Sequence, residues 1–247
     1  MSRLFNPDNG FFTFINKAID TFWLGFLWFV ISLGLVVAAI FIGVNAIFFA
    51  AIFISSFLIG PASSALYYAT VKVTRRSRSY ATKEFFRSFK MNFKVASPMS
   101  FIYSLFAYLM YIDIQYANAL IDEGNSFGNV MFAVFIAGCI FAGVSLAWAF
   151  PILSRFTVTL GGLFRNAILI ATRHLVRSFI LILIWGVVGL LVYIFYEFLL
   201  YLIILIPLIP GILALVRSFI IEPVLKKYTS ESEGTPEETG IDEWYRE

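Results

Sequence analysis

Long apolar runs separated by short polar segments dominate the pattern of this chain. No charged residue stands between Thr21 and Val71, and a helix needs about 20 residues to cross the hydrocarbon core of a bilayer, so this stretch alone predicts two spans. The runs are continuous rather than alternating, which favours helices over the strands of a barrel. The predicted spans are residues 21–43, 46–70, 98–120, 127–153, 178–196 and 198–221.

The composition supports the same class of protein. Of the 247 residues, 60% are hydrophobic and 13% are charged, whereas roughly a quarter of a soluble domain is charged. So few charges could not cover the surface of a soluble globule. We therefore expect an all-α polytopic membrane protein, with six helices arranged as three hairpins in a single transmembrane domain (residues 1–228) that is surrounded by membrane lipids. Residues 229–247 are polar and acidic, and we expect them to form a disordered tail.

Lysine and arginine are distributed unevenly among the connections. Segment 72–94 holds eight of them against one acid, Glu84, and segment 154–178 holds four arginines. The 121–126 connection has two acids and no base. Because short cytoplasmic loops carry the excess of Lys and Arg, we expect segments 72–97 and 154–178, and both termini, to be cytoplasmic.

The two basic segments have helical periodicity. In residues 82–94 the phenylalanines share one helical face and cations lie on another, which is typical of an amphipathic helix in the membrane interface. In the second segment Leu163 and Ile170 lie on one helical face, and the Gly161-Gly162 pair is expected to separate this helix from span four. Two interpretations stay open: the helices anchor the topology, or they dock a cytoplasmic or membrane partner.

Small residues follow Gly60 in the second half of span two, where they predict close packing of helices. This strip leads directly into the basic segment and the phenylalanine helix, so we expect a partner membrane protein to contact both. The predicted partner-binding residues are Gly60, Pro61, Ser63, Ser64, Phe85, Phe86, Arg87, Phe89 and Phe93.

The sequence offers little that could carry catalysis or bind a cofactor. Cys139 and His174 are the single cysteine and the single histidine, so neither has the companions that a zinc site requires. The sequence contains no P-loop and no nucleophile elbow. We expect no enzyme activity, no catalytic residues, no cofactor or metal, and no direct binding of nucleotide or nucleic acid.

Ionisable residues inside spans are functional candidates by default, and few occur here. Asp113 lies among tyrosines in the outer third of span three, which would suit a polar solute-binding patch or the outer membrane interface, where tyrosine is common. Arg217 and Glu222 lie near the inner end of span six, where we expect them to snorkel to the interface. The candidate polar patch consists of Tyr108, Tyr111, Asp113 and Tyr116.

Two groups of segments carry a family resemblance. The first is residues 59–68, with Gly-Pro-Ala and a following Tyr-Tyr, continued after the basic segment by residues 85–94. The second is residues 150–156 followed by 165–167 and 173–174. Together they resemble the YesL-like family of bacterial membrane proteins. Members are typically encoded beside carbohydrate ABC importers, so the resemblance implies an accessory role in sugar uptake at the bacterial plasma membrane, and it implies no catalytic residues.

The leading expectation is therefore a non-enzymatic accessory subunit that packs against the permease subunits of a carbohydrate (oligosaccharide) ABC importer. Segment 161–177 lacks the Glu-Ala-Ala-type pattern with which such permeases dock their ATPase, so the chain is not expected to be the permease itself. The alternative is a stand-alone transporter or channel for a small solute. Asp113 with its aromatic neighbours favours that alternative.

Overall fold

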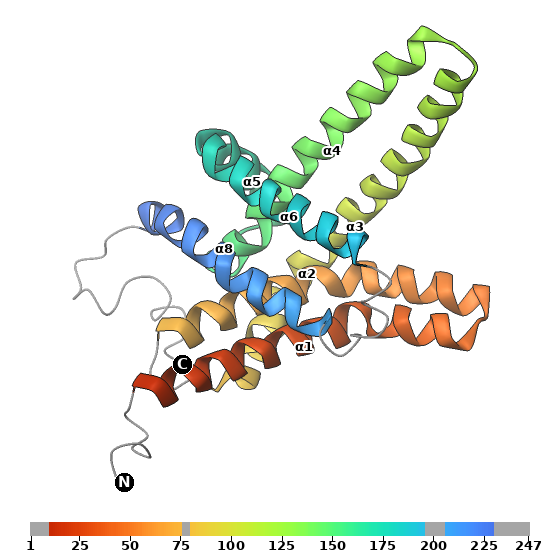
Figure 1. Cartoon of the computed structure of the whole chain (residues 1–247). Helices are drawn as coiled ribbons and strands as arrows, with labels where there is room; N and C mark the ends of the chain where they lie inside the picture. Colours follow the sequence, from red (N-terminus) through yellow and green to blue (C-terminus); the bar gives the residue numbers. More distant parts are fainter. Residues whose placement is uncertain (1–9, 76–79, 196–205, 230–247) are drawn as a thin grey trace.

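The computed structural model describes residues 10–75, 80–195 and 206–229, and all regular structure within these ranges is helical. This confirms the predicted all-α class. The elements, drawn in Figure 1, are α1 (Gly10–Ile42), α2 (Asn45–Arg75), α3 (Ala81–Asp122), α4 (Ser126–Leu153), α5 (Leu160–Arg173), α6 (Leu175–Ile194), α8 (Ile209–Leu225) and the short 3-10 turns η1 (Ile206–Leu208) and η2 (Lys226–Tyr228).

Five helices of the described ranges are long and apolar enough to cross a membrane: α1, α2, α3, α4 and α6. They correspond to the first five predicted spans, and the chain is a multi-pass membrane protein. The predicted sixth span starts at residue 198, and its first residues lie outside the described ranges, as does the predicted tail from residue 230 onwards. The described part of that span is η1 followed by the 17 residues of α8, which carry Pro210 in their first turn.

Helices α1 and α2 form one hairpin, and α3 and α4 form another. Each hairpin turns on a glycine with positive φ, 72° at Gly43 and 79° at Gly124, a conformation that glycine adopts without strain. Asn125 then caps α4, because its side chain accepts a hydrogen bond from the Phe127 amide at 3.0 Å. Figure 1 shows that the two hairpins pack together at one end and diverge towards their turns, so the two tips lie far apart.

Helix α3 corrects one prediction. The phenylalanine helix expected at 82–94 and the span expected at 98–120 form a single helix of 42 residues. Pro98 lies inside it, and no glycine separates the two segments. A proline is tolerated in a membrane helix because neighbouring groups satisfy the backbone groups that it frees. The phenylalanine segment therefore continues directly into the span and is not a separate interfacial helix.

The second inner helix exists, but it begins earlier than predicted. Gly161 and Gly162 lie inside α5, so they do not separate it from α4; the break is the non-helical segment 154–159. Thr159 starts α5, because its hydroxyl oxygen accepts a hydrogen bond from the Gly162 amide at 3.3 Å. A threonine at this position is a stronger start signal for a helix than a glycine pair is a stop signal.

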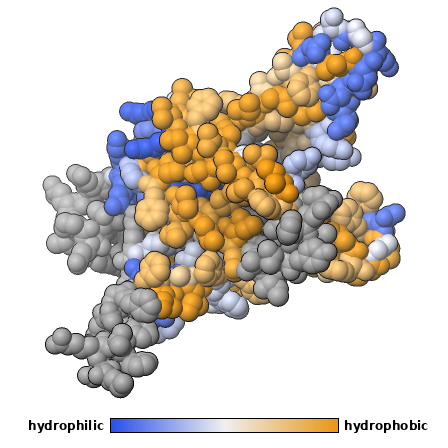
Figure 2. All heavy atoms as spheres, in the orientation of Figure 1, coloured by the Kyte–Doolittle hydropathy of each residue, from blue (hydrophilic) through white to orange (hydrophobic). Residues whose placement is uncertain are grey.

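The core of the protein lies where the ends of the helices meet, opposite the hairpin tips, and we call this region the junction. Met99 of α3, Trp148 of α4, Leu163 of α5 and Ile221 of α8 are fully buried there in one cluster. A second cluster joins α1, α2 and the start of α3, and it includes the fully buried Phe85. Figure 2 shows a broad hydrophobic surface between polar residues near the end of α8 and polar residues at the α3–α4 tip. Leu163 and Ile170, which form the apolar face predicted for α5, are buried in the first cluster, so this face packs on protein rather than on lipid.

A candidate functional site at the junction

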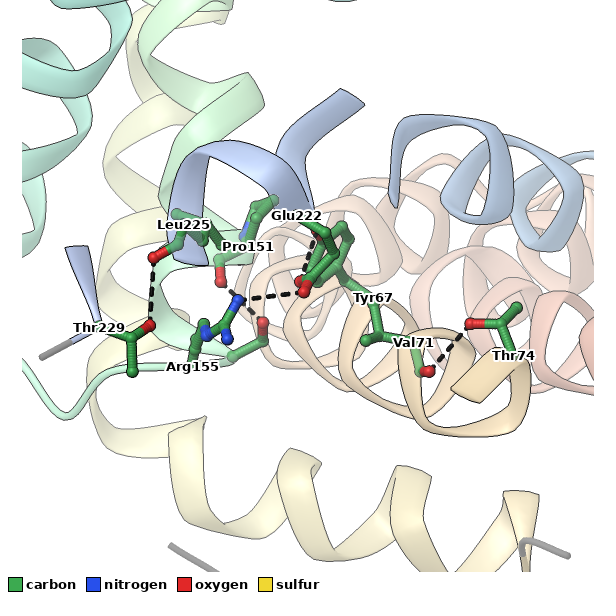
Figure 3. Close-up of polar contacts among 9 residues, drawn as sticks. Tyr67, Val71, Thr74, Pro151, Arg155, Glu222, Leu225 and Thr229 are labelled. Carbon is green, nitrogen blue, oxygen red and sulfur yellow. Dashed lines mark hydrogen bonds and ion pairs between the residues drawn. The ribbon is translucent and has the colours of Figure 1, made fainter. Parts of the chain in front are cut away.

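A buried ion pair lies at the junction. Arg155 donates a hydrogen bond from Nη1 to Oε2 of Glu222 at 3.0 Å, and the two side chains are only 3% and 10% exposed. The Tyr67 hydroxyl donates to Oε1 of the same carboxylate at 3.1 Å. Figure 3 shows these residues converging from α2, from the segment after α4 and from α8. Each oxygen of the carboxylate therefore accepts a hydrogen bond from a different element.

The end of α4 places the arginine. The Ser154 hydroxyl donates to the Pro151 carbonyl at 2.7 Å, which closes the last turn of the helix, and Arg155 follows directly (Figure 3). Burying two charges costs desolvation energy, and removing one partner leaves an uncompensated charge in the interior. We therefore interpret the pair as a contact that fixes which helices meet, rather than as a large source of net stability.

The prediction that Glu222 snorkels to the interface is wrong. The residue is 8% exposed, because its carboxylate is satisfied inside the protein. Arg217 of α8 is also held by protein: its Nη2 donates to the Ala147 carbonyl at 2.8 Å, and its guanidinium lies 5.4 Å from the centre of the Trp185 ring. The sequence contained a signal for both residues, since charged groups in or beside a span are functional candidates by default.

A hydrogen-bond chain links α4, α6 and α5 within the same region. The Trp148 indole donates to the Ser178 hydroxyl oxygen at 2.9 Å, and that hydroxyl donates to the Ala171 carbonyl at 2.9 Å. Tryptophan and serine are buried here, so each polar group needs the other. These two hydrogen bonds hold the first turn of α6 against the core.

A second ion pair holds α2 to α3. Lys72 Nζ lies 2.8 Å from Oε2 of Glu84, and the Tyr68 hydroxyl donates to the same oxygen at 3.3 Å. Lys72 is 5% exposed. Nearby, the hydroxyl oxygen of Thr82 accepts a hydrogen bond from the Trp23 indole of α1 at 2.8 Å. The first lysine of the basic segment therefore holds two helices together and does not face lipid headgroups.

The small residues predicted to face a partner instead pack α2 against its neighbours. A Cβ at Gly60 would stand 2.8 Å from the Ser100 Cβ and would overlap the Ala96 carbonyl oxygen, so a side chain does not fit. Ser64 is fully buried and accepts a hydrogen bond from Asn92 Nδ2 at 3.1 Å. Small residues allow this close approach of α2 and α3 within one chain.

The expected strip is therefore not a free surface. Of the predicted partner-binding residues, Gly60, Pro61, Ser64 and Phe85 are buried, Ser63, Arg87 and Phe89 are half-buried, and Phe86 and Phe93 are exposed. A partner could reach the buried residues only if α1 or α3 moved. The existence of a partner stays a prediction, and on this segment it would meet Phe86 and Phe93.

The predicted polar patch lies on the outside of α3. Tyr108, Tyr111 and Tyr116 are 61%, 61% and 58% exposed, and Asp113 is half-buried between them. The tyrosines therefore face the surroundings of the protein rather than its interior. The structure brings these residues together along one helix, but it does not enclose them.

A cavity of about 680 Å³ lies between the end of α4, the segment that follows it, α5 and η2. Most of its wall is apolar and includes Ile152, Phe156 and Leu169, while Arg173 and Tyr228 are among its polar lining groups. Sequence reasoning missed this site because its walls come from three separate elements.

His174 stands between α5 and α6, next to this cavity. Its Nε2 lies within hydrogen-bond distance of the Tyr228 hydroxyl, at 3.0 Å. Partial burial and the nearby cations Arg177, Lys227 and Arg173 lower the pKa of His174 below its ordinary value. The neutral ring can either donate to or accept from Tyr228, and it holds Tyr228 at the cavity.

The polar groups of the junction hold helices together and line a cavity that could bind a ligand. Within the described ranges, no group of three His, Cys, Asp or Glu side chains could hold a metal ion. The described junction pairs charges and caps helices, and its cavity combines apolar walls with a guanidinium. Such a cavity can bind a ligand that has both an apolar part and an anionic group.

Comparison with known protein families gives a match over part of the chain. The family model described as "Protein of unknown function, DUF624" matches residues 21–114, which cover most of α1, all of α2 and most of α3. YesL-like proteins belong to that family, so the match agrees with the first of the two sequence signatures. The matched range includes the Lys72–Glu84 pair and ends before Arg155 and Glu222. Neither the curated proteins nor the solved structures give a match.

Proposed function

We propose that this chain is a non-enzymatic accessory subunit of the bacterial plasma membrane that packs against the permease subunits of a carbohydrate (oligosaccharide) ABC importer. The observation that supports this proposal is the divergence of the two hairpins (Figure 1). A stand-alone solute pathway requires helices that enclose a route along the membrane, whereas the outer halves of these hairpins separate. The kind of importer and its cargo rest on the resemblance to YesL-like proteins alone.

In this proposal the junction faces the cytoplasm, because the basic segments lie at that end. Labelling with a membrane-impermeant thiol reagent in a Cys139→Ala background tests the orientation. A cysteine at position 125 is expected to react from outside intact cells, and a cysteine at position 79 only after the cells are opened. External labelling at position 79 would reverse the orientation.

Helix α6 offers a surface for a permease helix. After Leu181 none of its described side chains is buried, and no described atom outside the helix's own nearby backbone lies within 4 Å of a Cβ added at Gly186 or Gly189. Helices in lipid associate through close backbone approach, which glycine allows. We therefore propose that the partner contacts this face of α6 rather than the small-residue strip on α2, which is buried within the fold.

Affinity purification from the native cell in a mild detergent tests the partner. Permease subunits are expected to co-purify with the intact chain, and deletion of residues 231–247 should leave them bound. Replacing Gly186 and Gly189 by Leu should weaken the complex, while Gly143→Leu on the exposed side of α4 serves as the matched control. If no permease subunit co-purifies, the proposed function is wrong; if all three leucine replacements behave alike, the α6 surface is wrong.

The alternative function, a small-solute transporter or channel, is favoured by the polar patch around Asp113. Because the three tyrosines of that patch are exposed, we expect Asp113→Asn to leave uptake of the cognate sugar nearly unchanged. Uptake of labelled sugar, compared at equal protein level, provides the measurement. A complete loss of uptake in this variant would favour a solute path through the chain.

A further inference from the structure

The junction cavity lies beside the ends of two helices that are long and apolar enough to span a membrane. Helix α4 ends at Leu153, α6 begins at Leu175, and α5 connects these two span ends. Residues of the α4 end, of the following segment and of α5 line the cavity. The headgroup region of a bilayer borders the ends of its spanning segments, and a volume of about 680 Å³ is typical of sites for small molecules.

The walls of the cavity suit an acyl chain. Ile152 of α4 and Phe156 of the segment that follows α4 line one side, and Leu169 and Ile170 line it from α5. Leu169 is 53% exposed, so the apolar lining continues to the surface of the protein. Covering such surface with hydrocarbon removes it from water, which is favourable in proportion to the area covered.

The cavity also presents a cation that is suited to a phosphate. The Arg173 guanidinium lies over the Tyr228 ring, 5.8 Å from its centre, and Tyr228 is itself held by His174. This stacking orients the guanidinium but uses none of its N–H donors, and within the described ranges Arg173 forms no ion pair with a carboxylate. Guanidinium groups bind phosphate oxygens with two parallel hydrogen bonds.

We propose that the junction cavity binds one anionic phospholipid, with its phosphodiester on Arg173 and an acyl chain against Phe156 and Leu169. An anionic headgroup fits best because Arg177 and Lys227 add positive charge beside His174. The bound lipid would fill the space between α5 and η2 and so support the junction. The inference does not depend on the identity of the importer.

Native mass spectrometry of the full-length, delipidated protein tests this site. The protein is titrated with phosphatidylglycerol, with phosphatidylcholine of the same acyl chains, and with glycerol phosphate as a soluble phosphate ester. We expect phosphatidylglycerol to bind at one site with the highest affinity, and Arg173→Gln to weaken that binding by about tenfold, because a charge-assisted hydrogen bond is lost. Arg165→Gln is the matched control, since it removes the same charge from an exposed position of α5 outside the cavity.

A second variant examines the apolar wall. Leu169→Asn changes a partly exposed side chain, so folding should persist, which the melting temperature in detergent checks. We expect weaker binding of phosphatidylglycerol to this variant as well. Equal losses in the Arg165 and Arg173 variants would overturn the proposal, because they would show attraction by general charge. Glycerol phosphate binding as tightly as the lipid, or tighter lipid binding after deletion of residues 230–247, would also overturn it, in favour of a soluble phosphate ester or of the tail as the occupant.

Discussion

The junction and the hairpin tips are built from similarly apolar helices, yet large side chains are buried at the junction and exposed nearer the tips. Met99 and Trp148 at the junction are 0% exposed, whereas Phe41 and Val134 nearer the tips are 79% and 61% exposed. The junction differs in its buried charged groups, such as Arg155 and Glu222, whereas buried residues nearer the tips, such as Ala39 and Ala117, are small. In both regions glycines, such as Gly60 and Gly128, allow helices to touch. Hydrocarbon gives apolar side chains no reason to associate, so helices in lipid meet where small or polar residues join them. The exposed apolar area of the tips is therefore no evidence that the tips are unstable in a membrane.

Breaking the Arg155–Glu222 pair should have the largest effect. Glu222→Gln removes the carboxylate charge that faces the buried Arg155 guanidinium, and we expect the free energy of unfolding in detergent to fall by about 3–5 kcal/mol. Replacing both residues by apolar ones, Arg155→Met with Glu222→Leu, should recover most of the loss, since no charge then stays buried alone. Thermal unfolding followed by tryptophan fluorescence provides the measurement. A Glu222→Gln protein as stable as the parent would show that the junction does not depend on this pair.

Closing the gap between α2 and α3 should have the next largest effect. In Gly60→Ala the new methyl group would overlap the Ala96 carbonyl, and forcing the helices apart should lower stability by about 1–3 kcal/mol. Gly143→Ala is the control, because no described atom outside the helix's own nearby backbone lies within 4 Å of the new Cβ. We expect that variant to be neutral or slightly more stable, because alanine favours helix. Equal losses at both positions would remove the distinction between a packed junction and open outer surfaces.

Removing one hydrogen bond of the junction should have a smaller effect. Ser178→Ala takes away the acceptor of the buried Trp148 indole, and we expect a loss of about 1 kcal/mol together with changed tryptophan emission. Thr172→Ala is the control on α5, because the Thr172 hydroxyl is exposed and donates only to carbonyls of its own helix. The midpoint of unfolding in urea or in a denaturing detergent is measured for both variants, and only that of Ser178→Ala should fall.

The smallest expected effect is a dependence of stability on pH at His174. Its pKa is lower in the folded protein than its ordinary value of 6.5, so the unfolded chain binds a proton more readily. The stability contribution is therefore fully present above pH 6.5 and is lost as the pH falls through the lower, folded-state pKa. Melting temperatures between pH 7.5 and 5 should fall less steeply in His174→Gln than in the parent. Identical slopes would show that burial and the nearby cations Arg177, Lys227 and Arg173 do not lower the pKa of the ring.

The spans could be predicted from the sequence because the length of an uncharged run corresponds directly to the thickness of a bilayer. The turns at Gly43 and Gly124 were equally accessible, since few other residues adopt positive φ. The pairing of Arg155 with Glu222 was not, because 67 positions separate them and hydropathy says nothing about which polar groups meet. The small strip at Gly60 was identified correctly as a packing surface, but its partner lies in the same chain.

The unbroken α3 gives the protein a mechanical connection between its two ends. At 1.5 Å per residue its 42 residues form a rod of about 63 Å, roughly twice the hydrocarbon thickness. Glu84 near one end is tied to Lys72, and the other end carries the turn at Gly124. The part of α3 beyond Pro98, where the helix can bend, then works as a lever that ends at the α3–α4 tip. A small tilt at the junction would then become a larger displacement of the α3–α4 tip on the opposite side of the membrane.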